Sequence, residues 1–152
     1  MPRRGRVDAE TPAPLPRRRG HRATFIAAGV YNLAWGALAA LDPQHLFRST
    51  GLPPLDQPAV FACLGMVVGV YGLLYLEVAR RPEHGFAIAA VGLLGKLLGP
   101  IGMVHLVWSG RWPPAALWLS LANDCVWWGP FIVYLRDSWP LFRRTWTAER
   151  PS

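Results

Sequence analysis

Charged residues are scarce in this sequence. They make up 16% of its 152 residues, whereas hydrophobic residues make up 52%. A soluble domain usually carries about 25% charged residues, so this chain has too few for an ordinary water-facing surface. Its length suits one domain.

Cysteine and the motifs of soluble enzymes are also lacking. The two cysteines, Cys63 and Cys125, lie in separate hydrophobic stretches. Their spacing favours neither a disulfide nor a metal site, so we interpret them as small buried apolar side chains. No phosphate loop, Gly-x-Ser-x-Gly motif or paired-histidine zinc motif occurs. The sequence therefore predicts no metal and no cofactor, and it favours a protein that is not an enzyme.

The net charge of +7 raises the question of nucleic acid binding. Basic residues that bind phosphate form an exposed stripe or patch. Here they lie in the two tails and in short links between hydrophobic segments. We therefore predict a lipid bilayer as the partner, and no nucleic acid.

Four hydrophobic segments of 19–24 residues dominate the chain, over 23–41, 60–79, 85–108 and 115–135. A helix rises 1.5 Å per residue and a hydrocarbon core is about 30 Å thick, so about 20 residues cross it. A lone apolar span must be helical to satisfy its own backbone hydrogen bonds. Because the later links are short, neighbouring helices run in opposite directions. We predict an all-α membrane protein, an antiparallel four-helix transmembrane bundle.

The basic residues predict how this bundle is oriented. Thirteen arginines lie in the tails and in the second link, against two in the other links. Cytoplasmic segments carry such an excess. We predict a disordered basic cytoplasmic tail over 1–22, a transmembrane domain over 23–135, and a basic, aromatic cytoplasmic tail over 136–152. The preference for Arg over Lys indicates a GC-rich bacterial genome, which places the chain in the bacterial cytoplasmic (inner) membrane.

Glycines recur every three or four residues in two of the segments and form stripes without side chains. Such stripes let helices approach closely in lipid, where no hydrophobic force drives association. We expect them to bring segments 60–79 and 85–108 into contact, with a homodimer contact as the alternative. The helix-packing glycines are Gly65, Gly69, Gly72, Gly92, Gly95, Gly99 and Gly102.

Two prolines lie inside the third and fourth segments. Pro100 and Pro130 each remove a backbone hydrogen bond, so each tends to kink its helix. Both follow a glycine. Proline and glycine are tolerated in membrane helices, so we predict kinks rather than a function for them.

Polar residues at mid-depth are the most informative feature. Lys96 and Asp124 both lie roughly 16 Å from the cytoplasmic face, where an unpaired charge costs roughly 2.5–3.5 kcal/mol. We predict that they form an ion pair. Asn32, Tyr71 and Asn123 lie in the same layer, so every segment contributes a polar group. The cluster either fixes helix register or forms a pocket for a proton, ion, quinone or other small ligand.

The glycine and proline pattern resembles one known family. Asp42-Pro43 ends the first segment, Gly51-Leu52-Pro53 follows, glycines surround Lys96, and the last segment carries Asp124. This layout, over 23–136, resembles the DoxX-like group of small four-helix bacterial membrane proteins. The resemblance implies, by analogy, a membrane subunit of a quinone-linked oxidoreductase.

Three functions follow from these observations. The leading interpretation is a non-catalytic accessory or structural membrane protein with a buried polar cluster. The second is a small-solute or proton-coupled transporter that acts as an oligomer, because four helices seldom enclose a pathway alone. The third is the oxidoreductase subunit. The partner is accordingly a second copy of the chain or another membrane protein.

Overall fold

The computed structural model describes residues 15–148, and within this range every regular element is a helix. The long helices are α1 (Arg18–Leu41), α3 (Pro58–Arg80), α4 (Phe86–Trp108) and α6 (Trp128–Ala148). The short ones are α2 (His45–Thr50), α5 (Leu117–Asn123) and the 3-10 turns η1 (Pro114–Ala116) and η2 (Cys125–Trp127).

Three helices, α1, α3 and α4, are long and apolar enough to cross a bilayer. The outer surfaces of these helices are apolar. For example, Val67 of α3 and Leu98 and Ile101 of α4 each expose more than half of their surface. A water-soluble protein rarely exposes large contiguous apolar patches. The chain is therefore a helical membrane protein, as its composition predicts.

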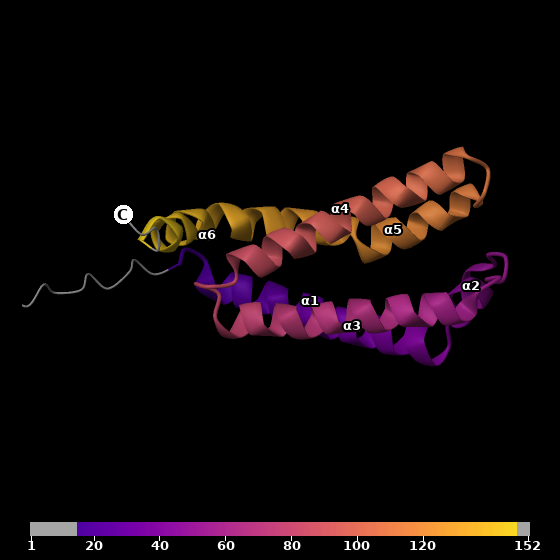
Figure 1. Ribbon diagram of the computed structural model, residues 1–152, viewed down its shortest axis with the longest axis horizontal. Helices are drawn as coiled ribbons and strands as arrows, with labels where there is room; N and C mark the ends of the chain where they lie inside the picture. Colours follow the sequence, from indigo (N-terminus) through magenta and orange to yellow (C-terminus); the bar gives the residue numbers. More distant parts are fainter. Residues whose placement is uncertain (1–14, 149–152) are drawn as a thin grey trace, which may run out of the picture.

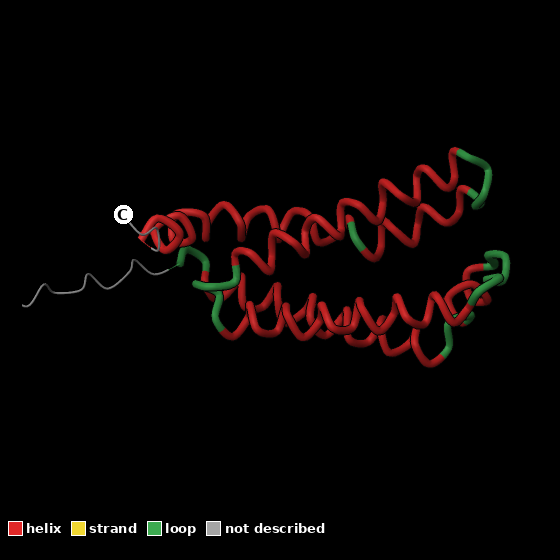
Figure 2. Tube along the Cα trace, in the orientation of Figure 1, coloured by secondary structure: helices red, strands yellow, loops and turns green. Residues whose placement is uncertain are grey.

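The fourth predicted span, 115–135, is not one helix. Figure 2 shows a loop between α5 and α6 near the middle of the molecule. In a continuous helix, the ring of Pro130 would clash with the carbonyl of Val126, which would also lose its N–H partner. The chain instead ends α5 at Asn123 and restarts at Trp128, so Pro130 lies in the first turn of α6, where proline is tolerated. The prediction of an unbroken helix here is wrong.

The helices form two layers, with α1 beside α3 and α4 beside α5 and α6 (Figure 1). The layers lie close together at the end where α1 begins, and they diverge toward the end that carries α2. This divergence makes room between the layers in one half of the molecule only.

Glycines make the contact between α1 and α3. A Cβ added to Gly36 would lie 2.5 Å from the carbonyl oxygen of Gly65, and one added to Gly72 would lie 2.7 Å from that of Gly29. Gly69 also approaches Gly36. The prediction that this α3 stripe contacts the following helix, α4, is wrong. The stripe faces α1 instead, because Gly29 and Gly36 of α1 have the same seven-residue spacing as Gly65 and Gly72 of α3. The backbones of α1 and α3 can therefore touch.

The glycines of α4 do not form a single packing face. Gly92 lies under the ring of Tyr75, where an added Cβ would come within 2.5 Å of the hydroxyl oxygen. Gly99 faces Asp124, whereas Gly95 and Gly102 have open space around them. Of this stripe, only Gly92 packs against α3.

A buried aromatic cluster joins the two layers near the start of α1. We call it the aromatic core: Phe25, Tyr75, Phe131 and Tyr134, each no more than 1% exposed. The ring of Phe25 lies 4.7 Å from both Phe131 and Tyr134, and Tyr134 donates a 2.7 Å hydrogen bond to the carbonyl of Pro82. Edge-on aromatic pairs stabilise beyond the area they bury.

The chain is ordered before the predicted start of the first span. Leu15 is buried, α1 begins at Arg18, and Asp137 accepts hydrogen bonds from Arg17 (2.6 Å) and His21 (2.8 Å). The hydrogen bond from the Arg17 guanidinium is the main reason that the pKa of Asp137 falls to about 2. The predicted disordered tail is thus wrong over residues 15–22, and its first fourteen residues lie outside the described range.

Candidate functional site

Lys96 and Asp124 meet between α4 and the break in the fourth span. Lys96 is only 5% exposed, and its Nζ lies 3.5 Å from Asp124 Oδ1. Nζ also donates a 3.1 Å hydrogen bond to the carbonyl of Asn123. A buried ammonium is tolerated where it is paired and hydrogen-bonded, and here one turn of chain supplies both partners.

The helix break supplies one of those partners. Asn123 is the last residue of α5, and the N–H of Trp127 donates to the carbonyl of Asp124, three residues back. Carbonyls at a helix end need partners from outside the helix. The carbonyl of Asn123 finds its partner in Lys96, so the interruption and the lysine stabilise each other.

Pro100 has a similar consequence on α4. In a helix the carbonyl of Lys96 would accept from the N–H of residue 100, which proline lacks. The indole N–H of Trp128 donates to this carbonyl instead, at 3.0 Å. Proline in one helix and tryptophan at the restart of the other therefore fix the two helices together at the level of the ion pair.

One carboxylate oxygen of Asp124 makes no hydrogen bond to the described residues. Oδ1 faces Lys96 and accepts from the side-chain amide of Asn123 at 2.9 Å. Oδ2 has no hydrogen-bond partner among the described residues. It faces Gly99, where an added Cβ would lie 2.8 Å away. The glycine thus makes room for the carboxylate rather than for a neighbouring helix.

A cavity of about 280 Å³ begins at this carboxylate and extends between the layers to α2, whose Leu46 and Phe47 line it. Aromatic side chains from several segments line it: Tyr31, Trp35, Phe47, Phe61 and Trp112. Asn123 and Asp124 supply its polar end, with the Ser120 hydroxyl nearby. Asp124 is the one charged residue in the lining.

The predicted polar cluster is only partly assembled. Lys96, Asn123 and Asp124 contact one another, whereas neither Asn32 nor Tyr71 forms a side-chain hydrogen bond with any of the three. Asn32 Oδ1 is buried without a partner in the described part of the chain, and Tyr71 lies beside Tyr75, ring centroids 6.4 Å apart.

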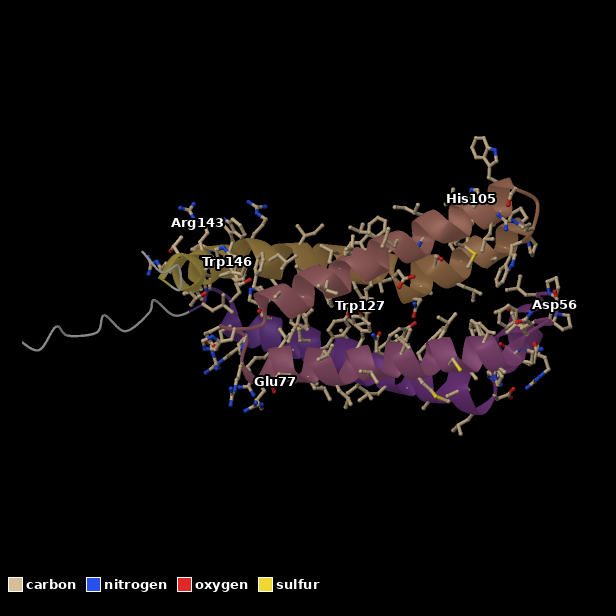
Figure 3. The ribbon with its side chains drawn as sticks, viewed as in Figure 1. Asp56, Glu77, His105, Trp127, Arg143 and Trp146 are labelled. Atoms are coloured by element: carbon tan, nitrogen blue, oxygen red, sulfur yellow. The ribbon has the colours of Figure 1, made fainter. Side chains whose placement is uncertain are left out.

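The structure also adds groups that sequence reasoning did not single out. The ring of Trp127 lies 6.0 Å from Lys96 Nζ and 5.7 Å from the ring of Tyr31, between the layers (Figure 3). Its indole N–H and Asn123 Oδ1 are buried without partners in residues 15–148. Aromatic residues are frequent throughout the chain, so no spacing rule distinguishes those that line the cavity.

Several other polar side chains lie outside this cluster. Glu77 pairs with Arg80 at 2.6 Å and with Arg81 at 3.7 Å. Cys63 is exposed on α3, so its interpretation as a buried side chain is wrong. The described residues contain no group of three His, Cys, Asp or Glu side chains arranged to hold a metal ion.

Comparisons with protein-family models, with curated proteins and with solved structures found no match for this chain. The resemblance to the DoxX-like group therefore stays a prediction. Function has to be argued from the site itself.

Proposed function

We propose that this chain is an antiparallel four-helix bundle in a bacterial cytoplasmic membrane, with both ends in the cytoplasm. The arginine count supports this orientation. Glu77, Arg143 and Trp146 lie toward one end of the molecule and Asp56 and His105 toward the other, which suits two membrane faces (Figure 3). The fourth crossing is made by α5 and the first part of α6.

Within this bundle we propose a non-catalytic accessory function: the protein holds one small amphipathic molecule in the cavity between its layers. The observation that carries this proposal is the cavity itself, which is aromatic along its length and ends on an unpartnered carboxylate oxygen. Ligand sites are concave and mostly apolar, with a few polar groups that fix orientation. This lining has that composition.

The ion pair suits a positioning role in such a site. Burying two charges costs several kcal/mol per ion, by an order-of-magnitude estimate, and pairing repays this only in part. A bundle held together by apolar packing would be at least as stable without the pair. Its presence beside a cavity is explained if Lys96 holds the Asp124 side chain in place at the polar end.

The binding function can be tested with a variant in which a larger side chain fills the cavity. Ala122 lines the cavity, whereas Ala37 lies on α1 outside the cavity lining. We expect wild type and Ala37→Phe, extracted with their lipids, to carry a small molecule that native mass spectrometry detects. We expect Ala122→Phe to lack it while retaining helical content. Equal occupancy in all three proteins, or none in any, would contradict the proposal.

A second function is favoured by the break at Asp124. Secondary transporters bind substrate near the bilayer midplane, at helices that are interrupted there. Because four helices seldom enclose a pathway, a transporter of this kind requires an oligomer. A strictly monomeric mass in the same spectra would exclude it. The oxidoreductase alternative has support only from the family resemblance.

A further inference from the structure

We propose that the cavity selects a small organic cation: an ammonium group attached to a compact apolar body. This inference rests on the proposed function, because it names the chemical class of the molecule that the cavity holds. It is carried by the charge of the lining, by its aromatic faces and by its size.

The charge of the lining has one sign. Asp124 Oδ2 is the formally charged group that faces the cavity without a protein partner, whereas Lys96 lies on the Oδ1 side and outside the lining. Neither Arg48, which pairs with Asp42, nor Arg111, which hydrogen-bonds to His105 and Ser109, belongs to the lining. An anionic ligand in the cavity would therefore meet a carboxylate and no cation of the lining.

The aromatic rings act in the same direction. Phe61 lies in edge-on contact with Trp35 (5.8 Å) and Phe47 (5.3 Å), and Phe47 likewise contacts Trp112 (5.5 Å). Together with Tyr31 these rings surround the space that leads to Asp124. The faces of aromatic rings carry negative charge density and attract cations, more strongly when water is excluded. Aromatic rings that lead to a carboxylate are the chemistry that recognises ammonium groups.

The size of the cavity limits the apolar body. About 280 Å³ lies just below the usual range for small-molecule sites. It suits a single aromatic ring or a short branched chain with its ammonium group, and it is too small for a whole phospholipid. Phenyltrimethylammonium fits this description, and tert-butylbenzene is its uncharged counterpart of nearly the same shape.

The experiment measures the binding of these two probes by calorimetry. The full chain is placed in phosphatidylcholine nanodiscs, where the lipid has no net charge, and Ala122→Phe gives the baseline for partitioning into lipid. We expect wild type to bind phenyltrimethylammonium about tenfold more tightly than tert-butylbenzene. The double variant Lys96→Gln/Asp124→Asn, which keeps polar groups but no charge, should lose this preference and still bind tert-butylbenzene.

The other outcomes separate the two proposals. If wild type binds both probes equally, or if the double variant keeps the cation preference, the inference fails and the binding function stands. If neither probe binds above the Ala122→Phe baseline, both fail. Should the double variant not fold, the wild-type comparison still decides, and Trp112→Leu, which removes a ring and no charge, should reduce the preference.

Discussion

The two halves of this molecule use the same kind of residue in opposite ways. In the half where α1 begins, the aromatic core of Phe25, Tyr75, Phe131 and Tyr134 is buried and joins the layers. In the other half, aromatic side chains line the cavity, and Phe47, Leu52 and Ala116 form a smaller buried cluster beside it. The comparison teaches that aromatic packing closes the space between the layers at one end and leaves a cavity at the other.

Truncating a side chain of the aromatic core should cause the largest loss of stability. Phe25 is fully buried against three rings, so Phe25→Ala should lower the free energy of unfolding by about 3–5 kcal/mol. Phe61→Ala, in the cavity lining, should cost less than half as much, because its side chain already borders empty space. Denaturant unfolding in detergent micelles measures both. Equal losses would show that the halves are energetically alike.

The Lys96–Asp124 ion pair lies where the two halves meet. Breaking it should cause the next largest loss of stability. Lys96→Ala or Asp124→Ala alone leaves a buried charge without its partner, which should cost about 3 kcal/mol. Replacing both should cost less than the sum of the two single losses. A double-mutant cycle on the unfolding free energies provides the measurement, and strictly additive losses would argue against the pairing.

Glycine contacts within one layer should matter less, and they offer a matched control. Gly36→Ala would place a methyl group against the backbone of Gly65, which should cost about 1–3 kcal/mol. Gly95→Ala meets open space and should be neutral or slightly stabilising, since alanine favours a helix. Thermal unfolding of the two variants tests this. A loss at Gly95 as large as that at Gly36 would contradict the assigned α1–α3 contact.

The smallest loss of stability should come from breaking the Arg17–Asp137 ion pair, at the end where α1 begins. The pKa of Asp137 is lowered to about 2, so its stabilising contribution is present above its unfolded pKa of about 3.9 and is lost as the pH falls toward 2. Asp137→Asn should cost about 1–2 kcal/mol at neutral pH. The difference from wild type should shrink as the pH falls through 2 and vanish below it, and a difference that persists there would show that the charge is not responsible.

The membrane character of the fold could be predicted because it depends on residue type and length. Any apolar run such as 60–79 or 85–108 must become a helix in lipid, whatever surrounds it. The pairing of Lys96 with Asp124 follows from the same reasoning, since two opposite charges at one depth stabilise each other. Pro130 also indicated a disturbance of the fourth span. Proline alone, however, does not predict whether a helix bends or ends, so the break between α5 and α6 could not be predicted.

The sequence by itself thus determined the long helices and the positions of the polar residues along them. Only the tertiary structure decided that the glycines of α3 face α1, that the chain breaks at Asp124, and that a cavity remains beside it. The physical reason is that depth along a helix follows from counting residues, whereas the face that each helix turns to its neighbours depends on how all the helices pack at once.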